Sequence, residues 1–452
     1  MKHAASSAPS SARLLGAWER VRTSFWFVPA LMALAAVASA YATVALDRHL
    51  GAERLAELGW VWSGGADGAR SVLSTIAGSM ATVAGVVFSV NIVALTLASS
   101  QFGPRLLRNF TRDLGNQLVL GTFIAAFLYC LLVLRVVRST DEGGFVPEVS
   151  VTCAVLLAVG GVGVLIYFIG HVAEAIQAEA LIAGVGRELK DEIADRYGPG
   201  PACDSGDPEA GVPDGTPQTV RAEAGGYVQG ISHDGLADAA ARLGTVAVVR
   251  VLHRPGDFVP TGEALALVHG AAHPLGEDAA SRVRRAFALG PRRTPTQDVR
   301  YGARQLTEIA VRALSPGIND PATAMGCMDW LGEALAELAR RTPEPAGRYR
   351  DGRLLVLSRP VGFAELAELA FTPMRTHGAG DPAVAVHFIR TLARTGRDGV
   401  EADRVALLRL AEQMAEDATR EAENEADRGR IADALTRARA ALGPDGAVPG
   451  PG

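Results

Sequence analysis

A polar stripe runs along one long apolar segment of the chain, residues 71–100. Its members are small or carry a hydroxyl group: Thr75, Gly78, Thr82, Gly85, Ser89, Thr96 and Ser99. They recur at alternating steps of three and four residues, with Ile92 filling the only gap. This spacing places them on one face of an α-helix, and Asn91 adds an amide to the same segment. Repeated around the axis of an oligomer, such a face would line a pore. It would equally suit close helix packing, because small residues let backbones approach and hydroxyls bond across helices.

A basic segment follows the stripe. We expect Gly103-Pro104 to end the helix, because proline lacks a backbone donor and clashes with the preceding turn. Arg105, Arg108 and Arg112 then recur at steps of three and four residues, which places them on one face of a second helix. These arginines suit contact with lipid phosphates at the membrane interface. The alternative is a basic vestibule that concentrates anions at a pore mouth.

A second polar cluster lies in the C-terminal half, on both sides of a predicted helix at 299–313. Its candidate residues are Arg293, Gln297, Asp298, Asn319 and Asp320. Asn319 or Asp320 suits the cap of the next helix, and Pro321 suits its first position. One interpretation is an elaborate helix-turn-helix corner. The other is a ligand pocket in which a capped helix presents free N–H groups to an anion.

Motifs for catalysis and metal binding are absent from the sequence. It contains no GxSxG, P-loop, HExxH or EF-hand pattern, and no zinc spacing among nine His and four Cys. The adjacent His233 and Asp234 are more typical of a helix cap than of a catalytic base and its orienting acid. No cysteine pair has CxxC spacing, and four cysteines do not make a disulfide scaffold. We therefore expect no enzyme activity, no metal and no cofactor.

Four apolar segments must position these residues, and each has the roughly 20 residues that cross a 30 Å hydrocarbon core as a helix. They cover residues 24–46, 71–100, 116–137 and 149–170. The first is longer than the 7–15 residues of a typical signal-peptide core, so we expect it to be retained. The second, at about 30 residues, must tilt, kink or protrude. The distribution of Arg and Lys in short loops favours both termini inside the cell.

The remaining sequence predicts a cytoplasmic α+β domain. Strands are expected at 219–223, 226–232, 245–252, 264–269 and 353–358, with helices at 234–243, 299–313, 321–341, 363–371, 382–395 and 401–442. Residues 198–217 read as a disordered linker, because ten of these twenty are Gly or Pro. The expected divisions are an arm (1–23), four transmembrane helices (24–171), a connecting helix (172–197), the linker (198–217), a β-rich module (218–270), a helical domain (271–442) and a disordered tail (443–452).

The overall charge argues against a nucleic-acid partner. In 452 residues, 44 Lys and Arg face 49 Asp and Glu, so the formal net charge is -5. A dedicated nucleic-acid binder carries a basic excess that this chain lacks.

Three stretches carry a family resemblance: residues 74–89, 98–110 and 313–321. Together they resemble a family of predicted bacterial integral membrane proteins that share a domain of unknown function. The resemblance implies an inner-membrane protein with a cytoplasmic C-terminal region, and it implies no particular activity.

These observations lead to one leading hypothesis and one alternative. The first is an oligomeric pore or ion-channel-like protein of the bacterial inner membrane, with the polar stripe along the path and the cytoplasmic domain as an assembly and gating unit. Its expected partners are the lipid bilayer, further copies of the chain and small ions. The alternative is a non-transporting membrane scaffold or sensor whose cytoplasmic domain binds a ligand or a partner protein.

Overall fold

The chain divides into two units, Met1–Ala180 and Leu181–Gly452, and each is described by itself. The structure is a computed structural model, and it describes residues 26–50, 65–102, 113–138, 145–175, 177–200, 208–342 and 344–443. The expected N-terminal arm at 1–23 lies outside the described residues, as does all but the first residue of the expected tail.

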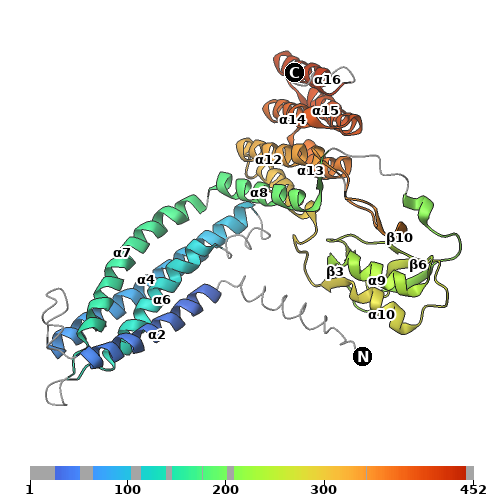
Figure 1. Cartoon of the computed structure of the whole chain (residues 1–452). Coiled ribbons are helices and arrows are strands. Elements are labelled where there is room, and N and C mark those ends of the chain that lie inside the picture. The colour runs from blue at the N-terminus through green and yellow to red at the C-terminus, as the bar shows by residue number, and fades with distance from the viewer. Residues whose placement is uncertain are drawn as a thin grey trace, which may run out of the picture. The chain divides into compact units, whose positions relative to one another are not determined.

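In the described part of the first unit, four apolar helices lie along one another (Figure 1). They are α2 (Phe27–Leu50), α4 (Ala66–Phe102), α6 (Leu114–Leu134) and α7 (Glu148–Ala175). Each is long and apolar enough to cross a membrane. The four predicted segments are therefore confirmed as helices, with ends that differ from the prediction by up to five residues.

Helix α4 is much longer than a bilayer requires. Its 37 residues form one uninterrupted helix of about 55 Å at 1.5 Å per residue, against a hydrocarbon core of about 30 Å. The structure describes it as far as Phe102, and Gly103-Pro104, where we expect the helix to end, lie outside the described residues. One side of α4 is buried against α6 and α7 through a seam of apolar residues. The seam includes Leu73, Met80, Val87 and Ala94, all at most 7% exposed.

Buried polar contacts join the helix ends of this unit. At one end, the Asp47 carboxylate is 5% exposed and accepts from the backbone N–H groups of Val149 (2.8 Å) and Ser150 (3.1 Å). It therefore caps the start of α7 from the end of α2. At the other end, Asp113 caps α6 by accepting from the Gly115 N–H at 2.7 Å, and it bonds Nε2 of His171 on α7 at 2.6 Å. A Cβ on Gly115 would lie 2.6 Å from His171 Nε2, so glycine permits this approach.

The second unit begins with a mixed layer of sheets. Its strands are β1 (Gly198–Pro199), β2 (Gln218–Arg221), β3 (Gly226–Ile231), β4 (Val248–Val251), β5 (Phe258–Val259), β6 (Ala264–His269), β7 (Phe287–Gly290), β8 (Arg341–Thr342), β9 (Gly347–Arg350) and β10 (Arg353–Leu357). They form a five-stranded sheet ordered β2-β6-β4-β10-β9, a three-stranded sheet ordered β5-β3-β7, and the pair β1-β8. All pairings are antiparallel except that of β10 with β4.

Two helices, α9 (His233–Leu243) and α10 (Glu277–Arg285), share one apolar core with these two larger sheets. The strands and the helix predicted between residues 219 and 269 are confirmed within a few residues. The cap of α9 is Ser232, whose hydroxyl accepts from the Gly235 N–H, and not Asp234. The sheet layer also takes β7, β9 and β10, which lie beyond the boundary expected at residue 270.

Part of the expected disordered linker is packed. Residues 208–211 form the short helix η3 (Pro208–Gly211), which lies against β10, and Val212 packs on the buried Val248 and Leu354. Glu209 also forms an ion pair with Arg250. The prediction of disorder from the Gly and Pro content is therefore wrong for residues 208–212, because the apolar contact of Val212 and the ion pair of Glu209 hold this segment in place. Residues 201–207 lie outside the described part.

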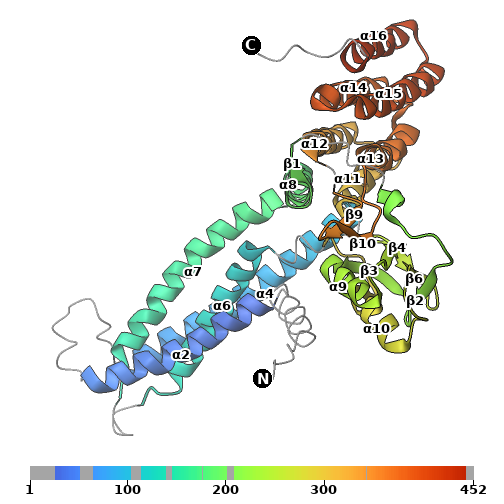
Figure 2. The ribbon, with the colours of Figure 1, turned by 45° about the vertical axis from the view of Figure 1, so that its right-hand side comes forward.

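Helices make up the rest of the second unit, shown from two sides in Figures 1 and 2. They are α8 (Ala178–Arg196), α11 (Val299–Ala313), α12 (Pro321–Ala339), α13 (Phe363–Gly378), α14 (Pro382–Thr395), the short η4 (Gly396–Asp398), α15 (Glu401–Glu421) and α16 (Glu425–Leu442). The connecting helix expected at 172–197 is in fact the end of α7 followed by α8. The single helix expected at 401–442 is in fact two helices, α15 and α16, which pack on each other. A new helix begins after Asn424, whose side chain caps α16 by accepting from the Asp427 N–H at 2.9 Å.

Candidate functional site

The polar stripe lies on the outer side of α4. Two residues along an α-helix correspond to a rotation of about 200°, so each position two after a seam residue points the opposite way. The pairs are Leu73 and Thr75, Met80 and Thr82, Val87 and Ser89, Ala94 and Thr96. The four hydroxyl residues are accordingly exposed. At Gly78 and Gly85 no atom lies within 4 Å of an added Cβ. Within the described part of the chain, this face is uncovered.

The hydroxyl groups of the stripe bond to their own helix. Thr75, Thr82, Ser89 and Thr96 each donate to the carbonyl oxygen four residues earlier, at 2.7–2.9 Å. Their protons are therefore satisfied, while the hydroxyl oxygens still have lone pairs free to accept. The face is weakly polar and uncharged. It can contact water, a second helix of the same kind, or a small cation.

The two other predicted pore residues, Asn91 and Ser99, do not join this face or cannot be placed on it. Asn91 falls on the seam side and is 4% exposed, so it is wrong as a pore-lining residue. Neither its amide nitrogen nor its amide oxygen has a hydrogen-bond partner among the described residues. Ser99 belongs to α4, but its side chain lies outside the described part. The basic residues Arg105, Arg108 and Arg112 also lie outside it.

The five residues predicted to form one C-terminal pocket are separated by helix α11. Asp298 precedes α11 and Asn319 follows it, and the 15 residues of that helix span about 22 Å. The prediction of one pocket is therefore wrong. Asn319 has φ 49°, in the left-handed region that asparagine tolerates, and Asp320 accepts from the Thr323 N–H at 3.1 Å. This end of α11 is the helix-turn-helix corner that was the alternative interpretation.

The other three predicted residues do come together, at the start of α11. Nη2 of Arg293 bonds Oδ2 of Asp298 at 2.8 Å, and the Asp298 side chain is 1% exposed. Gln297 has φ 60°, and its Oε1 accepts from the Ile231 N–H at 2.9 Å. Gln297 holds the start of α11 against β3, and Arg293 and Asp298 hold each other, so all three side chains are occupied by structural contacts.

A larger ionic network surrounds this point, and sequence reasoning missed most of it. Nη2 of Arg300 bonds Oδ1 of Asp257 and the Pro255 carbonyl, both at 2.8 Å, and its Nε bonds Asp298 at 3.4 Å. Burial alone would raise the pKa of Asp257, but the Arg254 N–H and the Arg300 guanidinium outweigh it, so that pKa lies below its ordinary value. The only signal in the sequence was the turn from Arg254 to Asp257, which predicts a loop and no partner.

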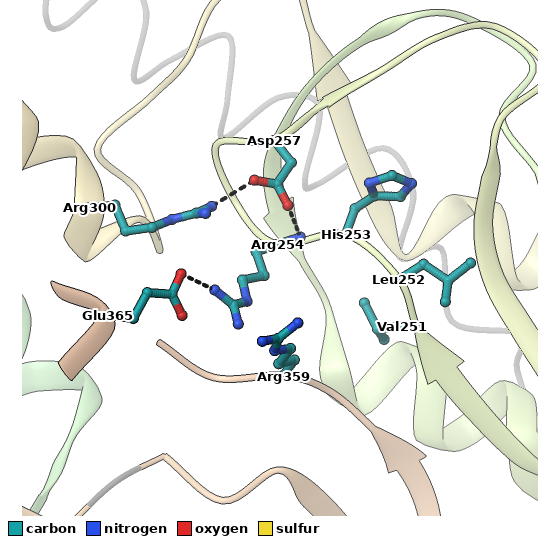
Figure 3. A pocket seen from close by; sticks show the side chains of 8 residues that line it. All are labelled: Val251, Leu252, His253, Arg254, Asp257, Arg300, Arg359 and Glu365. Atoms are coloured by element: carbon teal, nitrogen blue, oxygen red, sulfur yellow. Dashed lines mark hydrogen bonds and ion pairs between the residues drawn. The ribbon is translucent and has the colours of Figure 1, made fainter. Parts of the chain in front are cut away.

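A cavity of about 240 Å³ opens beside this network. Figure 3 shows the side chains that line it, which come from the end of β4, the β4–β5 loop, the starts of α11 and α13, and the segment after β10. Its lining comprises Val251, Leu252, His253, Arg254, Asp257, Arg300, Arg359 and Glu365. Nη1 of Arg254 bonds Oε1 of Glu365 at 2.5 Å. A smaller adjoining cavity of about 40 Å³ extends to Gln297 and Asp298. No group of three or more His, Cys, Asp or Glu residues in the described part could hold a metal ion.

One carboxyl group near the network predicts a pH dependence. Burial raises the pKa of Glu192 on α8 to about 7, although Arg196 opposes the shift. The folded state therefore binds more protons than the unfolded state between about pH 4.5 and pH 7, and stability falls as pH rises through this window. Since one pKa unit corresponds to about 1.4 kcal/mol, we expect a loss on the order of 2–3 kcal/mol. Glu192→Gln should abolish this loss of stability between pH 5 and pH 7.5, as measured by urea unfolding at the two pH values.

The control for this prediction is Asp191→Asn, which removes an exposed carboxylate from the same helix. Its pH dependence should match that of the parent protein. A Glu192→Gln variant that loses as much stability as the parent between the two pH values would contradict the assignment.

The described elements define a class: four apolar helices that are each long enough to cross a membrane, followed by a mixed α/β unit rich in helices. Residues 22–394 match the family described as "Predicted membrane protein (DUF2254)", and the chain belongs to this family. It is 34% identical over 380 residues to the uncharacterized protein Rv1290c of Mycobacterium tuberculosis, a match that covers 82% of this chain and 72% of that one. The uncharacterized protein Mb1321c of Mycobacterium bovis matches to the same extent. No solved structure matches the chain.

Proposed function

We propose that the chain is one subunit of an oligomeric pore of the bacterial inner membrane, with α4 of each subunit facing the axis. The observation that carries this proposal is the position of the polar stripe, opposite the seam by which α4 packs into its own subunit. A face of hydroxyls and glycines gains little from contact with lipid tails. It gains more from water or from another copy of itself.

The repeat of the stripe supports an assembly of several α4 helices. Thr75, Thr82, Ser89 and Thr96 are spaced by seven residues, and Gly78 and Gly85 keep the same interval. A strict seven-residue repeat keeps one face of a straight helix turned toward a common axis only if the helices supercoil left-handedly. The repeat continues for about three heptads, which is long enough to line much of a bilayer.

The chemistry of the stripe also limits what such a pore would conduct. It carries no ionisable side chain, so it offers no tight coordination and no proton relay. Small hydrated ions fit this environment. In this proposal Arg105, Arg108 and Arg112 lie at the cytoplasmic mouth, both termini are cytoplasmic, and the second unit assembles and gates the pore without acting as an enzyme.

A second candidate function uses the same membrane unit without conduction. In a scaffold or sensor, the stripes of neighbouring subunits would pack directly on one another, and the second unit would bind a ligand or a partner protein. The arginine-lined cavity beside α11 favours this candidate.

Cysteine accessibility separates the two candidates. In a background with the four native cysteines replaced, we introduce Thr82→Cys, Ser89→Cys and the control Val90→Cys, and reconstitute each protein in lipid vesicles. Val90 is 37% exposed and lies about 100° around the helix from Ser89. Only a thiol in water ionises and reacts with a charged methanethiosulfonate reagent. A pore predicts labelling of the two stripe cysteines at least tenfold faster than of Val90→Cys.

Oxidative cross-linking supplies the second readout. Stripe cysteines that form disulfides between subunits but resist the water-soluble reagent would indicate dry packing, which contradicts the pore and supports the scaffold. Stripe cysteines that neither cross-link nor react would contradict both candidates, because the stripe would then face lipid.

A further inference from the structure

We infer that the cavity lined by Arg254, Arg300 and Arg359 is a binding site for a small anion that carries phosphate or carboxylate groups. The inference concerns the second unit alone and does not depend on whether α4 lines a pore. Every residue of the site belongs to Leu181–Gly452.

The charges of the lining favour an anion. Three arginines face two carboxylates, Asp257 and Glu365, so one positive charge is left over. Arg300 is 8% exposed, and its Nε and Nη2 are engaged by Asp298, by Asp257 and by the Pro255 carbonyl. It therefore holds the wall of the cavity in place and leaves the binding role to the other two arginines.

Arg359 is the group without a counter-charge. It follows β10, is exposed, and makes no hydrogen bond or ion pair with the described residues. Its side chain enters the same cavity as Arg254, whose Nη1 is bonded to Glu365 (Figure 3). Two guanidinium groups that share a cavity repel each other unless an anion lies between them. Planar guanidinium groups match the oxygens of phosphate and carboxylate in bidentate geometry.

His253 adds a polar contact at the edge of the site. Its Nε2 lies 2.8 Å from the Ala264 carbonyl oxygen, so this nitrogen carries a proton and donates it. The ring is thereby fixed, and its Nδ1 is the nitrogen left for other contacts. The position of the imidazole at the lining is set by the backbone and not by a charged partner.

The size of the cavity restricts the ligand. About 240 Å³ falls below the 300–1,000 Å³ typical of drug-sized ligand pockets. A dinucleotide is therefore too large for full enclosure, while pyrophosphate, a phosphomonoester or a di- or tricarboxylate fits. The walls come from the β4–β5 loop, α11 and α13, so such a ligand would join the sheet layer to the helices of the second unit.

The test is a titration of the purified full-length protein in detergent with inorganic pyrophosphate and with citrate, at an ionic strength fixed with sodium chloride. Isothermal calorimetry should show saturable binding of at least one of them, and the tighter of the two indicates phosphate or carboxylate as the preferred group. Arg359→Gln should weaken this binding at least tenfold. Glu365→Gln should tighten it several-fold, because it removes a competing carboxylate and releases Arg254.

The matched control is Arg242→Gln on α9, an exposed arginine that likewise makes no hydrogen bond or ion pair with the described residues. It should leave the affinity within twofold of the parent value. A gain of affinity in Glu365→Gln cannot arise from misfolding, so the pair of opposite effects is specific to the site. No saturable binding to the parent protein, or binding that Arg359→Gln and Glu365→Gln both leave unchanged, would overturn the inference.

Discussion

Replacement of Arg300 by alanine should lower the free energy of unfolding of the second unit by about 3–5 kcal/mol, the usual cost of breaking a buried ion pair from one side. The guanidinium is 8% exposed and serves two carboxylates, one of which, Asp298, is 1% exposed. In the variant, Asp298 retains only Arg293, and Asp257 loses its charged partner. Urea unfolding of the full-length protein in detergent, followed by hydrogen exchange in α11 peptides, measures the loss.

The control for this variant is Arg394→Ala. Arg394 pairs with Asp329 at 2.5 Å, but the two side chains are 58% and 46% exposed. Solvent screens such a pair, and its removal should cost about 0–1 kcal/mol. Equal losses for Arg300→Ala and Arg394→Ala would show that burial does not set the strength of the network.

The second large effect concerns conduction. If the stripe lines a pore, Ser89→Trp should reduce ion flux into vesicles at least tenfold, because every subunit would place an indole ring in the path. Ser89 is exposed and opposite the seam, so the substitution should leave the fold of the subunit intact. Flux is measured with an ion-sensitive dye in vesicles that contain equal amounts of assembled protein.

Val90→Trp is the matched control for Ser89→Trp. It places the same side chain one residue further along α4, about 100° around the helix, where we expect lipid. Its flux should stay within twofold of the parent. If both variants reduce flux equally, or if the parent conducts nothing, the pore proposal fails.

The parts of the structure that the sequence predicts well are those set by local periodicity. The stripe on α4 follows from a three-and-four spacing that also fixes the opposite seam. Helix α11 begins and ends at the predicted residues, since its apolar period is regular and the corner after it carries Pro321 and a capping aspartate. Asn91 lies four residues after Val87 and three before Ala94, so the same spacing places it on the seam. This explains why its amide is buried, although the prediction placed it in the pore.

The parts that could not be predicted depend on contacts between distant residues. Arg254 and Glu365 are 111 residues apart, and no spacing rule relates them. The prediction of one five-residue pocket was wrong for a related reason. Its residues lie near the two ends of α11 in the sequence, and the length of that helix keeps the two groups apart. The break between α15 and α16 lacks glycine and proline, and its one local signal is the cap residue Asn424, which the prediction of a single helix overlooked.

The position of β10 determines how the second unit can be cut. The chain leaves the sheet layer after β7, forms α11 and α12, and returns to insert β10 between β4 and β9. A fragment that stops before residue 353 would expose β4 as an open edge, and such edges promote aggregation. Helices α11 and α12 are therefore an insertion into the sheet domain. The ribosome must synthesise the chain beyond Leu357 before the five-stranded sheet can form.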